Sequence, residues 1–380
     1  MKDLTKGKIS TLILGFAIPV FLGNLLQLTY SLVDTRIVGS FLGEDALAAV
    51  GATSTLSGLI IGFLLGLSNG FAIITAQKFG AKNIADMKKS FAMSLVIGTG
   101  ISILFTIAGL LFLKPILHFL NVPKHLVPAA KGYIAIIIAG LLATFLYDAC
   151  AATLRAIGDA VTPLIILAIS VALNIVGDLF FVVVLKTGVK GAAIATVLAQ
   201  IIAFVICWIY MIRKYEILRL QKEDFKDPSP IMVKEMISAG MSMGFMSSLV
   251  NIGTLTLQTA INKLGKDIII AHTAARKITE IFMIMFSVFG QTMATYCGQN
   301  MGAGKSDRVK RGIWLAIVYT AIWSGLTIIA SYTIGGWLVY LVTGSHNKTV
   351  ILNATNYLKF DTLFYIVTTL ICILRNAMQG

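Results

Sequence analysis

Five acidic residues lie inside long apolar stretches of this 380-residue sequence: Asp34, Asp148, Asp178, Glu280 and Asp361. A charged side chain at the centre of a membrane costs about 2.5–3.5 kcal/mol on insertion scales, and such residues usually serve ion or substrate pathways. A carboxylate in that setting can hold a proton, a metal cation or a positively charged ligand. These five residues are therefore the first candidates for function.

Asp34 lies near the end of the first apolar run, in NLLQLTYSLVDTRIVG. Tyr30 and Gln27 precede it by four and seven residues, so the three side chains fall on one face of a helix. We expect this polar face to be functional, with Gln27 and Tyr30 as substrate-binding candidates. The alternative is an interfacial Asp34 that pairs with Arg36 or caps the next segment.

Asp178 lies deeper, in ALNIVGDLFFVVV, one helical turn after Asn174. An amide and a carboxylate one turn apart can offer oxygen ligands to Na⁺ or hold a proton between them, and the alternative is an interhelical hydrogen bond of about 0.6–2 kcal/mol. Glu280 follows Arg276 by four residues, which predicts either an ion pair within one helix or a contact with a cationic substrate. Both alternatives stay open at this point.

Asp148 and Asp361 have basic neighbours in the sequence, Arg155 and Lys359, and local charge pairing is the favoured interpretation of both acids. Pro19 is the one proline well inside an apolar run. Proline removes a backbone hydrogen bond and kinks a helix, so the first helix should bend there, either as a static kink or as a hinge.

The composition predicts a membrane protein. Hydrophobic residues make up 57% and charged residues 13% of the chain, with a mean hydropathy of +0.87, whereas soluble domains carry about 25% charged residues. A soluble fold of this length cannot bury so much apolar surface. A soluble enzyme, a disordered chain and a disulfide scaffold are therefore excluded.

The remaining chemistry-bearing residues point away from catalysis. The four cysteines lie inside apolar stretches without CxxC spacing, which indicates buried apolar side chains rather than zinc or disulfide ligands. The sequence has no Walker A motif. We therefore expect no enzyme and no cofactor, and transport would have to draw on an ion gradient.

Apolar runs long enough to span the hydrocarbon need about 20 residues, and their lack of alternation excludes a β-barrel. The expected fold is an all-α polytopic membrane protein. It would have an N-terminal lobe (1–213), an inter-lobe loop (214–230) and a C-terminal lobe (231–380). The ten expected spans are 11–38, 46–76, 91–113, 130–152, 161–185, 190–213, 235–261, 268–298, 312–341 and 358–380.

The net charge of +14 follows mainly from basic residues in the loops between the expected spans. With the N-terminus inside the cell, 19 of the 31 Lys and Arg residues would lie on the inner side. Basic residues favour cytoplasmic loops, so a cytoplasmic N-terminus is expected. The basic excess then reports orientation in the membrane rather than binding of nucleic acid.

An internal repeat is visible at an offset of 222 residues. QKFGAKNIADMKKS (77–90) resembles QNMGAGKSDRVKRG (299–312), and the same offset pairs Gly43 with Gly265. Because six spans is an even number, both halves begin on the same side of the membrane. They should be parallel repeats, as in two-lobed transporters that bind their substrate near the midplane.

Several segments together resemble the multidrug and toxic compound extrusion (MATE) family, closest to its DinF/MepA-like branch. They are LVDTRIVGSFLGEDALAAVGATS, GFLLGLSNGFAIITAQKFGAKN, LRAIGDAVTP, LNIVGDLFF and GVKGAAIATVLAQ, and the similarity runs from residue 10 to 380. The resemblance implies twelve helices in two six-helix lobes. It also implies export of organic cations and other amphipathic drugs against H⁺ or Na⁺.

The resemblance also implies roles for individual residues. The family's first-helix aspartate and proline correspond to Asp34 and Pro19, its fifth-helix pair to Asn174 and Asp178, and a sixth-helix threonine to Thr196. Asp34, Asn174, Asp178 and Thr196 would form the ion-coupling site, with Na⁺ or a proton as its cation. The segment 241–261 lacks the seventh-helix acid of NorM-like members, which puts a second cation site in doubt.

The expected function is a monomeric, cation-coupled multidrug antiporter of the bacterial inner membrane, whose partners are small-molecule drugs and membrane lipid. The alternative is a related flippase for lipid-linked or polysaccharide precursors, which would need a cationic rather than an acidic cavity. A membrane-embedded enzyme or receptor is a further class, without support from paired catalytic residues or a large extramembrane domain. Ten of twelve expected helices are present, so a truncated, transport-incompetent product is also expected.

Overall fold

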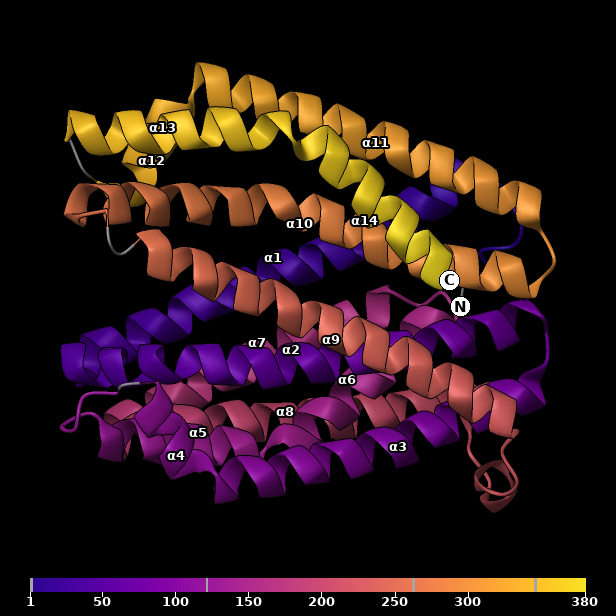
Figure 1. Ribbon diagram of the computed structural model, residues 1–380. Coiled ribbons are helices and arrows are strands. Elements are labelled where there is room, and N and C mark those ends of the chain that lie inside the picture. Colours follow the sequence, from indigo (N-terminus) through magenta and orange to yellow (C-terminus); the bar gives the residue numbers. More distant parts are fainter. Residues whose placement is uncertain (1–2, 121, 262–263, 345–346) are drawn as a thin grey trace. The chain divides into compact units, whose positions relative to one another are not determined.

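The computed structural model describes residues 3–120, 122–261, 264–344 and 347–380 (Figure 1), with backbone alone for residues 251, 255, 258, 259 and 266. Helices make up nearly all of the described chain, which contains no strand. The α-helices are α1 (Ile9–Leu42), α2 (Glu44–Gly80), α3 (Ile84–Leu111), α4 (Leu113–Phe119), α5 (Val127–Ala139), α6 (Leu141–Ala156), α7 (Val161–Asp178), α8 (Val189–Lys214), α9 (Pro230–Ile261), α10 (Lys266–Gly302), α11 (Ser306–Thr333), α12 (Gly335–Thr343), α13 (Lys348–Leu363) and α14 (Tyr365–Gln379). A π-helical turn, η1 (Leu179–Val184), continues α7, and two 3₁₀ turns, η2 (Glu216–Leu218) and η3 (Lys222–Phe225), follow α8.

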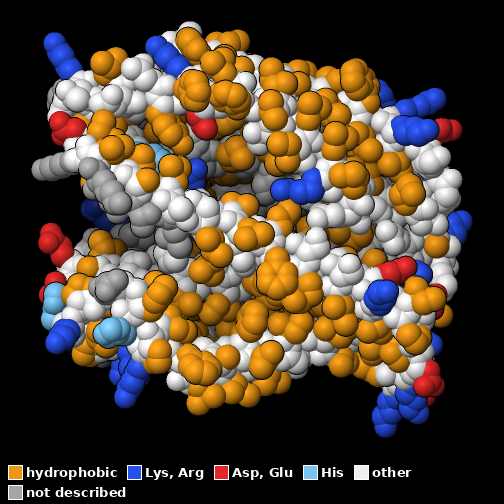
Figure 2. Space-filling view, viewed as in Figure 1, with side chains coloured by type: hydrophobic (Ala, Val, Ile, Leu, Met, Phe, Trp, Pro, Cys, Tyr) orange, Lys and Arg blue, Asp and Glu red, His pale blue; other side chains and the backbone are white. Residues whose placement is uncertain are grey.

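The expected all-α membrane fold is confirmed. Among the described residues, seven helices are long and apolar enough to span a membrane, and two bent pairs, α5 with α6 and α13 with α14, raise the number to nine. The seventh expected span, 235–261, falls within α9, a helix of 32 residues that is not among these nine spans. Figure 2 shows apolar side chains over most of the visible face and Lys and Arg mainly at its edges.

The internal repeat appears in the helix boundaries. Shifting the bounds of α2 and α3 by 222 residues gives the bounds of α10 and α11. The α5–α6 bend of 44° has its counterpart in the α13–α14 bend of 48°. Left-handed backbone recurs in register too, because Gly43 (φ 84°) matches Gly265 (φ 95°) and Lys82 (φ 59°) matches Gly304 (φ 68°). Only the second repeat places glycine at the latter position, where glycine adopts positive φ without strain.

The chain divides into two compact units. The first is built from Leu22–Asn251, and the second from Leu4–Phe21 together with Ile252–Gly380. The division therefore runs through α1 and α9 and leaves the first turns of α1 with the second unit. These two units are defined by which parts of the chain pack together. The two lobes expected from the sequence, 1–213 and 231–380, stay a prediction.

Each unit has its own apolar core. In the first, side chains of α2, α3, α5 and α6 interlock around Phe71 and Phe145, and Phe145 packs against Gly98, where a Cβ atom would lie 1.8 Å from the ring. In the second, small and aliphatic residues of α10 pack against α12 and α13 around Val339 and Leu358. These cores leave many large apolar side chains exposed, as a surface in contact with lipid requires.

A buried carboxylate organises the corner between α6, α7 and α8. Asp159, 7% exposed, accepts hydrogen bonds from the backbone N–H of Thr162 (3.0 Å), the Thr162 hydroxyl (2.6 Å) and the Tyr215 hydroxyl (2.6 Å). It thereby caps α7 and holds the residue that follows α8. Burial raises the pKa of Asp159, but the hydrogen bonds from Thr162 and Tyr215 outweigh that effect and leave this pKa below its usual value.

Replacing this carboxylate should destabilise the first unit in a pH-dependent way. A depressed folded-state pKa contributes stability above the unfolded-state pKa and loses it as pH falls. Asp159→Asn should therefore cost about 1–3 kcal/mol at neutral pH, and its difference from the parent should shrink below about pH 4. Thermal unfolding in detergent at pH 7 and pH 4 measures both values. Asp307→Asn, an exposed acid at the start of α11, is the control, and equal losses in the two variants would contradict the capping role.

Candidate functional site

Three helices of the first unit bring the proposed ion-coupling residues together. α1 supplies Tyr30 and Asp34, α7 supplies Asn174 and Asp178, and α8 supplies Thr196. Residues four apart on one helix share a face, so α1 and α7 each present two of these side chains in the same direction. The Thr196 hydroxyl also donates to the carbonyl oxygen of Ala192 at 3.0 Å, which fixes its rotamer against α8.

The Asn174 amide is the centre of the hydrogen-bond network. In the orientation that satisfies its neighbours, its Nδ2 donates to the Tyr30 hydroxyl (3.2 Å) and to Oδ2 of Asp178 (3.1 Å). Its Oδ1 then accepts from the backbone N–H of Thr196 (3.0 Å) and lies 3.3 Å from the hydroxyl of the same residue. The Tyr30 and Thr196 hydroxyls also lie 3.4 Å apart. Asn174 thus links all three helices and fixes the position of Asp178.

Two carboxyl groups face each other beside this network. Asp178 is 0% and Asn174 3% exposed, and Asp34 lies within hydrogen-bonding reach of Asp178. The Oδ1 atoms of Asp34 and Asp178 are both buried without a hydrogen-bond partner. No Lys or Arg in the described chain forms an ion pair with either acid, so the alternative pairing of Asp34 with Arg36 is wrong.

This arrangement suits a small cation. Two facing carboxylates repel each other when both are ionised, and a bound cation or a shared proton removes that repulsion. The unpartnered Oδ1 atoms of Asp34 and Asp178 are oxygen ligands of the type that hard cations prefer. The residues present could therefore hold one Na⁺ or one exchangeable proton.

A cavity of about 40 Å³ adjoins the Asn174 amide. Its polar lining comes from Gln27 and Tyr30 of α1, from Ser170 and Asn174 of α7, and from Thr196 and Gln200 of α8. A volume of this size accommodates a water molecule and is far smaller than the several hundred Å³ of typical drug pockets. The sequence-derived substrate candidates Gln27 and Tyr30 therefore lie near the Asn174 amide, at a space suited to a small species.

Two further residues and one backbone feature belong to this site. Gln200, one turn after Thr196 on α8, has a buried, unpartnered Oε1. Its spacing of four residues from Thr196 places it on the same helix face, so the sequence pattern could have indicated it. Tyr133 of α5 lies near both Asp34 and Asp178, and no local spacing indicates this. The π-helical turn η1 begins directly after Asp178. π-Helical turns within helices are frequent at functional sites.

Glu280 has a different partner from the one its spacing indicated. Its Oε2 lies 3.3 Å from Nζ of Lys277, in an exposed pair three residues apart, rather than beside Arg276. Residues three and four apart are both neighbours on a helix, so spacing alone could not choose between Arg276 and Lys277. A substrate contact of Glu280 stays a prediction.

The other in-span acids are separate from the paired carboxylates. Asp361 accepts a hydrogen bond from the Tyr365 hydroxyl (3.0 Å), while Lys359, its expected partner, lies over the Tyr332 ring. Asp148 forms no ion pair in the described chain, and Arg155, its expected partner, donates to Oδ1 of Asn69 (3.3 Å). Pro19 lies within the single continuous helix α1, and its function as a hinge stays a prediction.

Comparison with known proteins gives a consistent set of similarities. A model of the MatE family matches residues 19–180 and 242–380. The probable multidrug resistance protein YpnP of Bacillus subtilis (strain 168) is 30% identical over 367 residues, covering 96% of this chain and 80% of the relative. The probable multidrug resistance protein YoeA of the same organism is 28% identical, with 86% and 70% covered.

Solved structures agree at the level of the fold. The crystal structure of MATE in complex with MaL6 superposes with a TM-score of 0.92 at 22% identity, over 100% of this chain and 84% of that one. Relatives named multidrug export protein MepA and DNA damage-inducible protein F also match. The resemblance inferred from the sequence motifs is confirmed.

Proposed function

Because this chain belongs to the MatE family of multidrug efflux transporters, we propose that it is a cation-coupled antiporter driven by H⁺ or Na⁺. It would export organic, mostly cationic amphipathic compounds across the bacterial inner membrane, with its N-terminus in the cytoplasm. The observation that carries this proposal is the facing pair Asp34 and Asp178, each with a buried Oδ1 atom and without an ion-pair partner in the described chain.

The coupling would act through charge. With both carboxylates ionised, the site holds two negative charges in a space that water enters poorly, and a proton or Na⁺ halves that charge. A ligand shifts a conformational equilibrium by its difference in affinity for the two states. Loading the site from outside would favour the state that releases drug, and unloading it inside would favour the state that binds drug.

The same charge favours cationic cargo over the precursors that a flippase moves. A lipid pyrophosphate needs Arg or Lys donors in the cavity, whereas the groups gathered at this site are carboxylates, amides and hydroxyls. An organic cation would be attracted to the unloaded site. It would bind outside the cavity of about 40 Å³, and the coupling ion would weaken that binding by neutralising the carboxylates.

Substituting the paired acid should affect coupling far more than substituting the other in-span acids. Asp178→Ala should reduce efflux of ethidium from inverted vesicles, driven by imposed pH or Na⁺ gradients, by at least about tenfold, since it removes one of two charges. Asp148→Ala and Asp361→Ala are the matched controls, because each removes a carboxylate within a span but outside the pair. Equal losses in all three variants, at equal amounts of folded protein, would contradict the proposal.

A further inference from the structure

The segment that precedes α1 is held by side chains almost 300 residues away. The backbone N–H of Leu4 donates to Oε1 of Gln299 (3.0 Å), and Nδ2 of Asn300 donates to the Leu4 carbonyl oxygen (3.2 Å). Leu4 is 1% exposed, and Gln299 and Asn300 are fully buried. All of these residues belong to the second unit.

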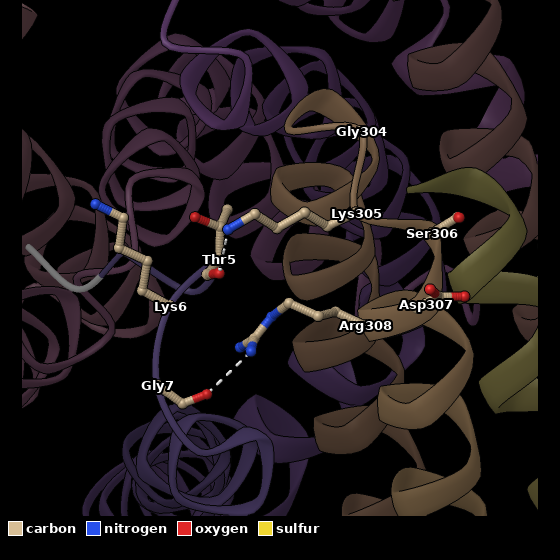
Figure 3. Close-up of a pocket in the computed structure, with 8 residues that line it drawn as sticks. All are labelled: Thr5, Lys6, Gly7, Gly304, Lys305, Ser306, Asp307 and Arg308. Atoms are coloured by element: carbon tan, nitrogen blue, oxygen red, sulfur yellow. Dashed lines mark hydrogen bonds between the residues drawn. The ribbon is translucent and has the colours of Figure 1, made fainter.

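Two basic side chains complete this contact. Nζ of Lys305 donates to the carbonyl oxygen of Thr5 (2.9 Å). The Arg308 guanidinium donates to the carbonyl oxygens of Gly7 (3.0 Å) and Leu4 (3.3 Å), and its Nε donates to Oδ1 of Asn300 (3.2 Å). Figure 3 shows Lys305 and Arg308 reaching toward residues 5–7, while Asp307 points away. We call Gln299, Asn300, Lys305 and Arg308 the N-terminal anchor.

The charged half of the anchor, Lys305 and Arg308, is specific to the second repeat. At the same turn of the first repeat, the positions equivalent to Lys305 and Arg308 are Asn83 and Asp86. Those two residues bond to each other, with Nδ2 of Asn83 donating to Oδ2 of Asp86 (2.8 Å) and the Asp86 N–H donating to Oδ1 of Asn83 (3.1 Å). In the first repeat, Asn83 and Asp86 therefore bond to each other, whereas in the second repeat Lys305 and Arg308 use charged donors to bind residues 4–7.

The helix that follows the anchored segment belongs to both units. α1 is continuous from Ile9 to Leu42, but its turns up to Phe21 pack in the second unit and its turns from Leu22 pack in the first. Asp34 lies in the latter part. A displacement at Asp34 can reach the second unit along α1, whose early turns pack there, and the anchor adds a fixed point at the start of that helix.

We infer that Lys305 and Arg308 are positioning residues for transport: they fix the start of α1 to the second unit, so that cation binding at Asp34 in the first unit moves the second. This inference rests on the proposed cation coupling at Asp34. It adds that Lys305 and Arg308 are needed to transmit the movement of α1 to the second unit. Lys305 and Arg308 act through backbone carbonyl oxygens of residues 4, 5 and 7, so their contribution to the contact lies in the two donors.

The anchor can be tested by the reactivity of Thr5→Cys toward a membrane-impermeant maleimide, with the four native cysteines replaced by Ala. Thr5 is 6% exposed, so its cysteine should react slowly. Arg308→Ala removes three charge-assisted hydrogen bonds and should raise the labelling rate by about tenfold or more. Arg311→Ala, an exposed arginine three residues further along α11, should leave the rate unchanged.

The coupling is tested by separating cation binding from transport. Arg308→Ala should bind the coupling cation with parental affinity, measured as Na⁺- or proton-dependent thermal stabilisation, yet lose about tenfold in gradient-driven ethidium efflux, and Arg308→Lys should recover part of the loss. Parental efflux in Arg308→Ala, or unchanged Thr5→Cys labelling, would overturn the inference. If the parent chain shows no cation-dependent stabilisation, the proposed function fails, and the labelling comparison still reports whether the anchor exists.

Discussion

Replacing Asp34 with Asn should abolish cation-driven efflux while leaving the protein folded. Asn has nearly the same shape as Asp but cannot change its charge by binding a proton, and it gives a cation one neutral oxygen in place of a carboxylate. The unpartnered Oδ1 of Asp34 would no longer be an anionic ligand beside Asp178. Efflux of a fluorescent organic cation from inverted vesicles should therefore fall to background under both pH and Na⁺ gradients.

The matched control for this variant is Asp45→Asn. Asp45 is an exposed acid in the first turn of α2, so its substitution removes one carboxylate outside the site. It should transport at the parental rate. Parental efflux in Asp34→Asn, at an equal amount of folded protein, would remove the coupling role of this residue.

The second large effect is expected where α2 meets the first half of α9 within the first unit. Gly66 and Gly70 of α2 face the backbone of α9, and a Cβ atom on either would lie 2.5 Å from a carbonyl oxygen, that of Met243 or Ala239 respectively. Small residues four apart allow membrane helices to approach this closely. Gly70→Ala should force the helices apart and destabilise the protein by about 1–3 kcal/mol.

The control lies on the same helix. A Cβ atom at Gly58 meets nothing within 4 Å, so Gly58→Ala should leave the thermal unfolding temperature unchanged or raise it, because Ala favours the helix. Thermal unfolding of both variants in detergent separates a steric effect from a helix-propensity effect. Equal shifts in the two variants would show that the contact between α2 and α9 contributes nothing.

Much of the fold is predictable because it follows from local pattern. The apolar runs predict most of the spans, and the 222-residue offset anticipates that α10 and α11 repeat the bounds of α2 and α3. The bent pairs are harder to foresee, since Gly140, the C-cap of α5, interrupts a run that reads as one span. The division of α1 between two units depends on packing, and nothing in the sequence of α1 indicates it.

The candidate site is predictable in part for the same reason. Asn174 and Asp178 share a face because they are four residues apart, and so do Tyr30 and Asp34. Thr196 came from the family resemblance alone, and Tyr133 lies near the carboxylates only because of the packing of α5. The N-terminal anchor joins residues almost 300 positions apart through backbone acceptors, which leave no trace in side-chain pattern.

The most direct test of the central claim is to count the cations that leave the site when an organic cation binds. The purified chain in weakly buffered detergent solution is titrated with ethidium while a pH indicator follows protons, and a parallel sample preloaded with radioactive sodium follows Na⁺. If Asp34 and Asp178 hold the coupling ion, ethidium should displace about one proton or one Na⁺ per protein, and Asp34→Asn should abolish the release. Saturable ethidium binding without release of either ion, or the same release from Asp34→Asn, would contradict the account.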